Sequence, residues 1–261
     1  MITKSLQKMD IKEIVRRKSE LIELKKAEIK TVKGGLTMLQ DCSVIKTNKI
    51  SEDSDNVLKR TIVGNTYMWM DSHDDVHAKG VFTKSIKERQ NSIFHLHDHK
   101  FEVTAKVGEP SQVYEKEMSW MDFGVSKSGT TTALLMDSSI MKEYNSKVFN
   151  EYKSGRITQH SVGMQYVKMD LAVNDEEYEE EYKVWKDNID NLGNSEQANE
   201  KGYFWFVREA KLIEISAVLL GSNSLTPTLE NKQADLSSLD VVEPSDDTQE
   251  KELLTYYKSL N

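Results

Sequence analysis

The chain has 261 residues, of which 38% are hydrophobic and 30% charged, and its formal net charge is −8. This length suits one large domain, or one domain with appendages. The negative charge argues against a protein that mainly grips nucleic acid. A single cysteine, Cys42, excludes an internal disulfide and favours a reducing compartment. No apolar run long enough for a membrane span and no signal-peptide pattern is present, so we expect the protein to stay in the cytoplasm of the cell that makes it.

The N-terminal part is predicted to be a basic helix over residues 3–32, ended by Gly34-Gly35. Its apolar stripe of Val15, Ile22 and Ile29 is narrow. The helix is therefore expected either to pair with a partner helix or to pack loosely on its own domain. Polar residues 51–56 indicate a linker. We predict a helical segment 1–35, a linker 36–59 and a packed domain 60–225.

Within the packed domain, strand and helix patterns alternate. We expect a helix over 138–154, capped by Asp137 or Ser138 and ended by Gly155. The acidic insertion 170–202 is expected to form a solvated helix or mobile loop, and residues 226–261 a flexible acidic tail with a short helix around 253–257. A shorter helix is predicted at 80–89, and strands at 61–70, 93–99, 101–107, 112–121, 130–136, 155–167 and 203–220.

Ser161 is a candidate nucleophile on the strand 155–167. Side chains alternate between the two faces of a strand, so Ser161 shares a face with Gly163, while His160 points to the other. The missing side chain at Gly163 leaves space beside the hydroxyl. A serine hydroxyl needs a base within hydrogen-bond reach, and this base must come from another segment.

The histidines supply two interpretations. His95, His97 and His99 alternate, so a strand would put all three on one face. One of them, His97, could be the base for Ser161. Alternatively, histidines spaced in this way could share a zinc ion. Asp71, His73, Asp74 and His77 could add ligands, although a polar turn explains these four residues better.

Glu214 is the candidate third group, which would orient the imidazole. Its strand face also carries Leu212, Ser216 and Val218, and a carboxylate among apolar side chains is costly to bury unless it is paired. A structural ion pair with Arg208 or a lysine is the competing explanation.

Taken together, these segments resemble the tailed-phage prohead maturation proteases, which are capsid-assembly serine proteases related in fold to herpesvirus assemblin. The resemblance covers roughly residues 60–225. It rests on the aspartate-rich turn 71–82, on Leu96-His97-Asp98, on the helix 138–154 followed by Ser161-Val162-Gly163-Met164, and on Leu212-Ile213-Glu214-Ile215-Ser216-Ala217-Val218 with Asn223. Val81 and Met164 depart from the family pattern, which has alanine and an aromatic residue there.

The resemblance implies an α+β fold with an antiparallel β-barrel core flanked by helices. It also implies a serine endopeptidase with Ser161 as nucleophile, His97 as base and Glu214 as orienting carboxylate, and with no cofactor or metal. Choosing His97 over His95 or His99 rests on the His-Asp match alone. Backbone amides near Val162 and Gly163 are the expected oxyanion hole.

The expected substrates are scaffold segments and extensions of the major capsid protein inside the immature phage head, together with the protease itself. Self-cleavage is expected in the linker 36–59 or after Asn223. No membrane or specific nucleic acid partner is expected, and a homodimer is possible. Two alternatives stay open: a zinc-dependent hydrolase built on His95, His97 and His99, and a non-catalytic head-assembly scaffold protein.

Overall fold

The computed structural model describes residues 9–30, 46–47 and 53–231 of the chain. It has an α+β fold built on one mixed sheet. The helices are α2 (Ile11–Arg16), α3 (Lys18–Ala27), α4 (Thr83–Arg89), α5 (Ser146–Lys153), α6 (Glu179–Asn188) and α7 (Ser195–Lys201). The strands are β1 (Ile29–Lys30), β2 (Lys46–Thr47), β3 (Val57–Thr66), β4 (Asp75–His77), β5 (Phe94–His97), β6 (Lys106–Ser119), β7 (Thr130–Met141), β8 (His160–Val173), β9 (Tyr203–Ala217) and β10 (Thr228–Asn231).

The sheet has the strand order β1-β8-β9-β5-β6-β7-β3-β10-β2, and β4 pairs with β9 outside this path. Most neighbours are antiparallel, but β5 and β4 both run parallel to β9. The order does not return to its first strand, and the described residues show no closure of the sheet into a barrel. The sheet is thus mixed and open, where the sequence predicted an antiparallel barrel.

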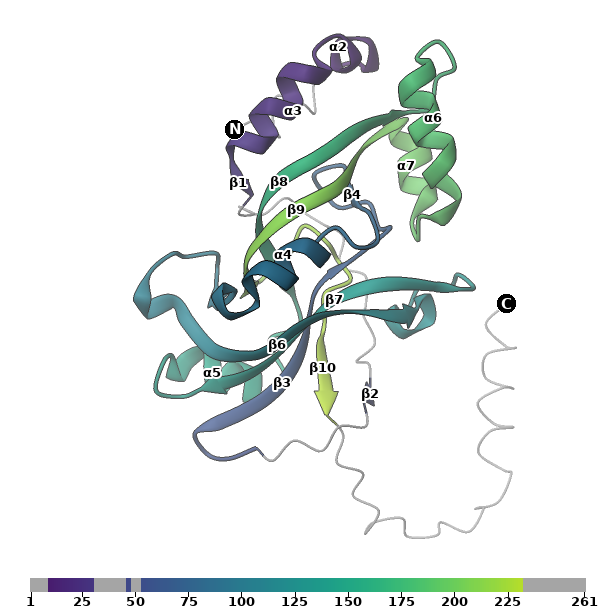
Figure 1. The fold of residues 1–261 in the computed structure, drawn as a ribbon. Helices are drawn as coiled ribbons and strands as arrows, with labels where there is room; N and C mark the ends of the chain where they lie inside the picture. The colour runs from purple at the N-terminus through teal and green to yellow at the C-terminus, as the bar shows by residue number, and fades with distance from the viewer. Residues whose placement is uncertain (1–8, 31–45, 48–52, 232–261) are drawn as a thin grey trace, which may run out of the picture.

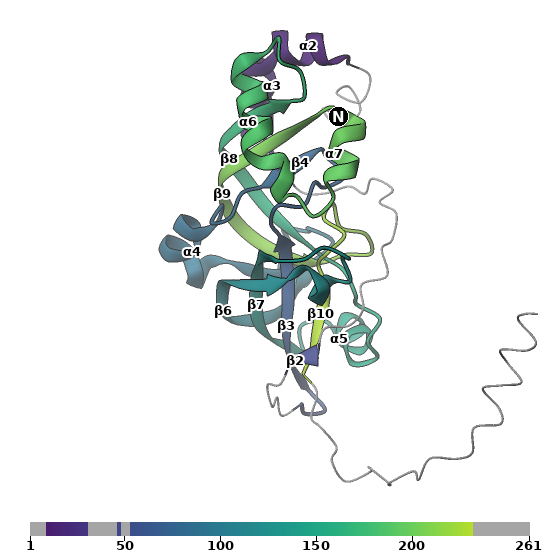
Figure 2. The same cartoon turned by 90° about the vertical axis from the view of Figure 1, so that its right-hand side faces the viewer.

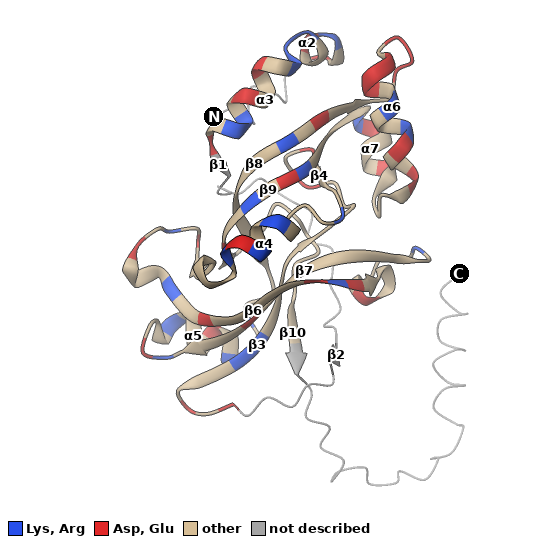
Figure 3. Ribbon diagram, in the orientation of Figure 1, with Lys and Arg blue, Asp and Glu red and all other residues tan. Residues whose placement is uncertain are grey.

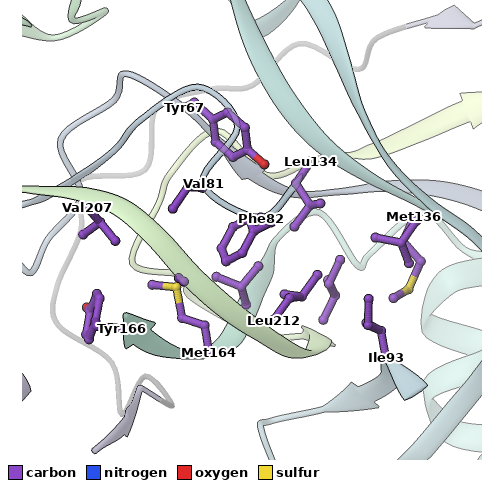
Figure 4. Packing of buried hydrophobic residues seen from close by; sticks show 14 of the residues in the cluster. Tyr67, Val81, Phe82, Ile93, Leu134, Met136, Met164, Tyr166, Val207 and Leu212 are labelled. Atoms are coloured by element: carbon purple, nitrogen blue, oxygen red, sulfur yellow. The ribbon is translucent and has the colours of Figure 1, made fainter. Parts of the chain in front are cut away.

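The long strands β8 and β9 form a twisted antiparallel ribbon that organises the molecule (Figure 1). Helices α2 and α3 flank it on one side, and α6 and α7 pack at its far end (Figures 1 and 2). Alternating side chains of the ribbon enter a core that it shares with β3, β6 and β7. Figure 4 shows part of this core, with Phe82 of the segment before α4 between Met164 and Leu212 of the ribbon and Leu134 and Met136 of β7.

The described N-terminal segment packs on the sheet. Ile14 of α2 and Leu21 of α3 are buried in the same core as the ribbon. The helix predicted over 3–32 is interrupted at Arg17 and ends at Ala27, after which β1 pairs with β8. Of the two expectations for this segment, the structure shows packing on its own domain. Deleting residues 1–33 would therefore expose core surface.

A buried ion pair fixes α3 to the sheet. Lys25 Nζ lies 2.5 Å from Asp75 Oδ1, and the ammonium group also faces the rings of Tyr166 and Trp205. The Tyr166 hydroxyl donates a hydrogen bond to the other oxygen of Asp75. Both charged side chains are removed from water, so each depends on the other for compensation.

Replacing Lys25 with alanine should lower the free energy of unfolding by about 3 kcal/mol, because the buried Asp75 carboxylate loses its cation. Urea unfolding monitored by circular dichroism measures this change. Lys26→Ala is the matched control, since the Lys26 ammonium bridges to Glu23 at the surface and its loss should cost less than about 1 kcal/mol. Equal losses in the two variants would show that the buried pair adds nothing specific.

The acidic insertion is ordered and helical rather than a mobile loop. Strand β8 continues through it to Val173, and α6 and α7 follow. Trp185, Leu192 and Ala198 are buried in a second core cluster with Phe204. Acidic residues are concentrated at the start of α6, which is red in Figure 3, and Glu181 among them is buried. Two of them, Glu180 and Glu181, bind Lys18 of α3 across the top of the ribbon.

Residues after Asn223 continue the fold. Residues 222–227 are buried, and β10 pairs with β3. Thr226 O accepts from the His160 amide, while Pro227 O accepts from the Val63 amide. The predicted tail boundary at 226 is therefore too early. The helix expected around 253–257 lies outside the described residues.

The helix predicted over 138–154 is also shorter than expected. Strand β7 runs to Met141, and α5 begins at Ser146 with Asn145 as its cap; the Asn145 side chain accepts from the Val148 amide. Ser138 is therefore a strand residue and not a helix cap. No helix in the described part of the chain has the length and apolar character that a membrane crossing requires.

Candidate active site

The register of the central ribbon brings two serines and a carboxylate together. Ser161 of β8 lies opposite Ser216 of β9, and Gly163 lies opposite Glu214. Directly opposed residues of an antiparallel pair share a face, so Ser161, Ser216 and Glu214 lie on the same side of the sheet. All three are buried.

Gly163 makes room for the Glu214 side chain. A Cβ atom at position 163 would lie 2.0 Å from Glu214 Oε1 and 2.7 Å from its carboxyl carbon. The carboxylate therefore lies directly over the glycine backbone. The sequence predicted open space beside the Ser161 hydroxyl at this position, but the structure fills it with Glu214.

His99 reaches this carboxylate from the end of β5. Strand β5 ends at His97, and Asp98 and His99 then take left-handed backbone conformations with φ of 53° and 54°. The Asp98 amide donates to Ala217 O at 2.9 Å, and the His99 amide donates to Ser216 Oγ at 3.1 Å. This turn places His99 Nδ1 2.5 Å from Glu214 Oε1.

His97, the predicted base, does not contact Glu214. Its Nδ1 lies 3.1 Å from Oδ2 of the exposed Asp98 side chain, at the end of β5. The prediction assumed that β5 continues through residue 99, which would keep His97 and His99 on one face. The left-handed turn at Asp98 and His99 breaks this alternation, so His99 takes the place assigned to His97.

The hydrogen bonds define the protonation of the His99 ring. A carboxylate only accepts, so Nδ1 carries a proton and donates it in the hydrogen bond to Glu214, and in the neutral ring the lone pair is on Nε2. His99 Nε2 is buried and has no hydrogen-bond partner among the described residues. An imidazole held in this way through Nδ1 has the tautomer that a general base requires.

Hydrogen bonding also separates the two serines. Ser216 Oγ is engaged, because it donates to Glu214 Oε2 at 2.6 Å and accepts from the His99 amide. Ser161 Oγ is buried and makes no hydrogen bond to any described residue. Ser161 therefore has a hydroxyl available for chemistry, whereas Ser216 does not.

His95 and His160 belong to a separate buried network. His160 Nδ1 donates to Thr226 O at 2.9 Å, so its Nε2 accepts from the Tyr152 hydroxyl at 2.9 Å. The Tyr152 oxygen then accepts from His95 Nε2, and His95 Nδ1 accepts from Ser138. This assignment satisfies every member while both rings are neutral. Burial lowers the pKa of His95 to about 3 and that of His160 to about 4.

Stability should fall as the pH drops below about 6.5, because unfolding frees both rings to take up a proton that the folded state excludes. The contribution of the two neutral rings to the free energy of unfolding is complete above the unfolded-state pKa of about 6.5, and it is lost progressively as the pH falls toward 4. At pH 5 each ring should cost on the order of 2 kcal/mol. Urea unfolding at pH 7 and pH 5 measures the difference.

His160→Gln should remove roughly half of this pH dependence, because one of the two titrating rings is gone. An unchanged pH dependence in that variant would mean that other groups cause it.

The histidines do not converge on a metal ion. His95 binds Ser138 and Tyr152, His97 binds Asp98, and His99 binds Glu214. Across residues 9–30 and 53–231, no group of three or more His, Cys, Asp or Glu side chains is arranged to hold a metal. Residues 71–74 form a polar turn that leads into β4, and Asp71 Oδ1 accepts from the His73 and Asp75 amides.

A cavity of about 490 Å³ lies further along the ribbon. Gln165 and Lys211, which pair across β8 and β9, line its floor. Gln165 is two positions after Gly163 and so shares its face. Lys84 and Arg89 of α4 form another wall. Tyr166 and Val167 of β8 also line the cavity, whereas Ser161, His99 and Glu214 do not.

Comparisons with protein-family models, with curated protein sequences and with solved structures found no match to this chain.

Sequence reasoning selected Ser161 and Glu214, which the structure brings to one face, but assigned no role to Ser216. A signal for Ser216 was present, because it lies two positions after Glu214 on the same strand face. The position of His99 depends on a left-handed turn in two non-glycine residues. Asp and His adopt such conformations more often than most other non-glycine residues, but the contacts with β9 that hold this turn come from a distant segment.

Proposed function

We propose that this protein is a serine endopeptidase in which Ser161 is the nucleophile, His99 the general base and Glu214 the group that orients His99. One observation carries the proposal. The Nδ1 atom of the buried His99 is bound to the buried carboxylate of Glu214 on β9, and the Nε2 atom of His99 has no partner among the described residues. Strand β8, which pairs with β9, carries the Ser161 hydroxyl, which also has no hydrogen bond to a described residue. This is the arrangement of roles found in nucleophile, base and carboxylate triads.

The reaction is acyl transfer. Ser161 Oγ attacks the peptide carbonyl carbon while His99 Nε2 takes the hydroxyl proton. Glu214 keeps the imidazole in position and stabilises the imidazolium that forms. His99 then gives the proton to the leaving amine, which yields an acyl-enzyme and the first product. Water, deprotonated by His99, attacks the acyl-enzyme and releases the second product and Ser161.

Two features of the site concern the change that would have to precede catalysis. Ser161 Oγ and His99 Nε2 are not hydrogen bonded to each other, as is common before substrate binds. Ser161 is also only 3% exposed, so a peptide reaches its hydroxyl only after the site opens.

The biological role in this proposal rests on the resemblance to the prohead maturation proteases. The substrates would be scaffold segments and capsid-protein extensions inside the immature phage head, and the protease would also cleave itself. An assemblin-like arrangement of the strands and a homodimer are parts of the same proposal. Of the matching segments, the Ser161 strand and the Glu214 strand are adjacent in the ribbon.

Self-cleavage is the first test. The intact mass of the purified protein should decrease with time in the wild type and in Ser154→Ala, a control at an exposed serine, but not in Ser161→Ala. Because residues 57–66 and 228–231 are paired in the sheet and residues 222–227 are buried, we expect cuts between residues 36 and 56 or after Asn231. Equal shortening of all three proteins would refute a serine-dependent mechanism. If Ser161→Ala had no effect on any activity of the protein, the scaffold alternative would be favoured.

A further inference from the structure

We infer that Ser216 is a positioning residue, whose hydroxyl locks the Glu214 carboxylate and the backbone of His99 into one arrangement. This inference rests on the proposed function for its catalytic meaning, although the geometry stands independently of it. Ser216 is fully buried and lies directly opposite Ser161 across the β8–β9 ribbon.

The Ser216 hydroxyl forms one hydrogen bond with Glu214 and one with the backbone of His99. A hydroxyl has one proton to donate and lone pairs to accept with. The proton goes to Glu214 Oε2 at 2.6 Å, and a lone pair receives the His99 amide proton at 3.1 Å. A single side chain therefore joins strand β9 to the turn after β5.

The first bond controls the carboxylate. With Oε2 held by Ser216, Oε1 is directed at His99 Nδ1. A hydrogen bond to an ionised carboxylate favours its charged form, and it is stronger than a bond between neutral groups. Without it, a fully buried oxygen would lack a partner, so the carboxylate would rotate to find one. Rotation would move the negative charge out of line with the imidazolium that it stabilises.

The second bond controls the histidine. Asp98 and His99 both have positive φ, which is uncommon for residues other than glycine and persists where surrounding contacts impose it. The His99 amide bond to Ser216 and the Asp98 amide bond to Ala217 O are two such contacts, and both come from β9. Ser216 thus aligns both partners of the His99–Glu214 pair.

The test uses the full-length protein and a fluorophosphonate probe, which forms a bond from an activated serine Oγ to phosphorus with loss of fluoride. Loss of one bond to a charged group is worth roughly 1.5–3 kcal/mol, so Ser216→Ala should slow labelling of Ser161 about ten- to a hundredfold. Ser216→Thr keeps the hydroxyl and should restore most of the rate. Ser85→Ala is the matched control, because Ser85 is another buried serine that bonds to a β9 backbone, at Leu212.

A second measurement does not require activity. The Nδ1 proton of His99, seen by proton NMR of protein carrying nitrogen-15 in its histidines, should give a downfield resonance in the wild type, in Ser216→Thr and in Ser85→Ala. In Ser216→Ala this resonance should shift or disappear. If it stays unchanged there, Ser216 does not position the pair and the inference is overturned.

The two measurements separate the two claims. A wild type that is not labelled at Ser161 would overturn the proposed function, while a resonance that responds only to Ser216→Ala would still support the positioning role. A wild type labelled at Ser161 together with an equal rate in Ser216→Ala would overturn the positioning role alone. Equal losses in Ser216→Ala and Ser85→Ala would also overturn it, because they would indicate a general effect on packing.

Discussion

His99→Ala should reduce peptide cleavage by roughly 10⁴-fold or more, which is the scale seen when a triad loses its base. The reason is specific to this imidazole. His99 is bound to Glu214 through Nδ1, and its Nε2 has no hydrogen-bond partner among the described residues. Cleavage of a peptide that spans the mapped self-cleavage site measures the change. Circular dichroism of the variant confirms that the chain still folds.

His97→Ala is the matched control for this prediction, because it removes an imidazole two residues away, at the end of strand β5. His97 contacts the exposed Asp98 side chain, so its loss should change the cleavage rate by no more than a few-fold. The opposite pattern, an inactive His97→Ala with an active His99→Ala, would restore the assignment that the His-Asp match in the sequence suggested. It would also contradict the triad described above.

Gly163→Ala should lower the cleavage rate by at least about a hundredfold, although it adds one methyl group and removes no functional group. The new Cβ would lie 2.0 Å from Glu214 Oε1, so the carboxylate has to move off the position from which it holds His99. The same displacement should lower stability, because Glu214 is fully buried and its bond to Ser216 would be disturbed. Cleavage kinetics and thermal unfolding of the one variant test both effects.

A double-mutant cycle with Glu214→Gln shows whether the effect of Gly163→Ala passes through the carboxylate. If it does, each single variant should be strongly impaired, and the double variant should be little worse than the poorer of the two. Effects that multiply would mean that the methyl group acts elsewhere, for example on the approach of the substrate, and would contradict this explanation.

Sequence patterns located most of the elements but not all of their boundaries. Strand β9 was predicted almost to its ends, because its apolar and β-branched residues are continuous and extend over most of 203–217. The C-terminal end of β7 and the first residue of α5 were missed, because Ile140 and Tyr144 precede α5 at the spacing of a helix. Pairing with β3 and β6 places Ile140 in the sheet instead.

Only part of the candidate site was predicted, because the rest depends on contacts between segments far apart in the sequence. Ser161 and Glu214 were selected because alternation within a strand is readable from local sequence. Their pairing through Gly163 depends on the β8–β9 register, and the choice of His99 depends on a turn that β9 imposes on Asp98 and His99. Those are tertiary contacts between segments far apart in the chain, and no local pattern encodes them.

Charge and polarity predicted the surroundings of two segments poorly. The segment 175–181 is acidic enough to predict a solvated helix or a mobile loop, and α6 does begin in it, but Trp185 and Leu192 nearby anchor it to the second core cluster. Residues 222–227 look like the start of a tail because they are small and polar. They are buried because their hydroxyl, amide and carbonyl groups bond to β3 and β8, as in the bond from Thr66 to Leu225 O. Composition alone could not reveal these partners.

The most direct test of the triad is the site at which a fluorophosphonate probe reacts with the folded wild-type protein. We predict one adduct, which peptide mapping by mass spectrometry places on Ser161, and no adduct in His99→Ala or in Ser161→Ala. An adduct on Ser216 or on another serine, or a folded wild type that takes up no probe, would contradict the assignment of Ser161 as an activated nucleophile.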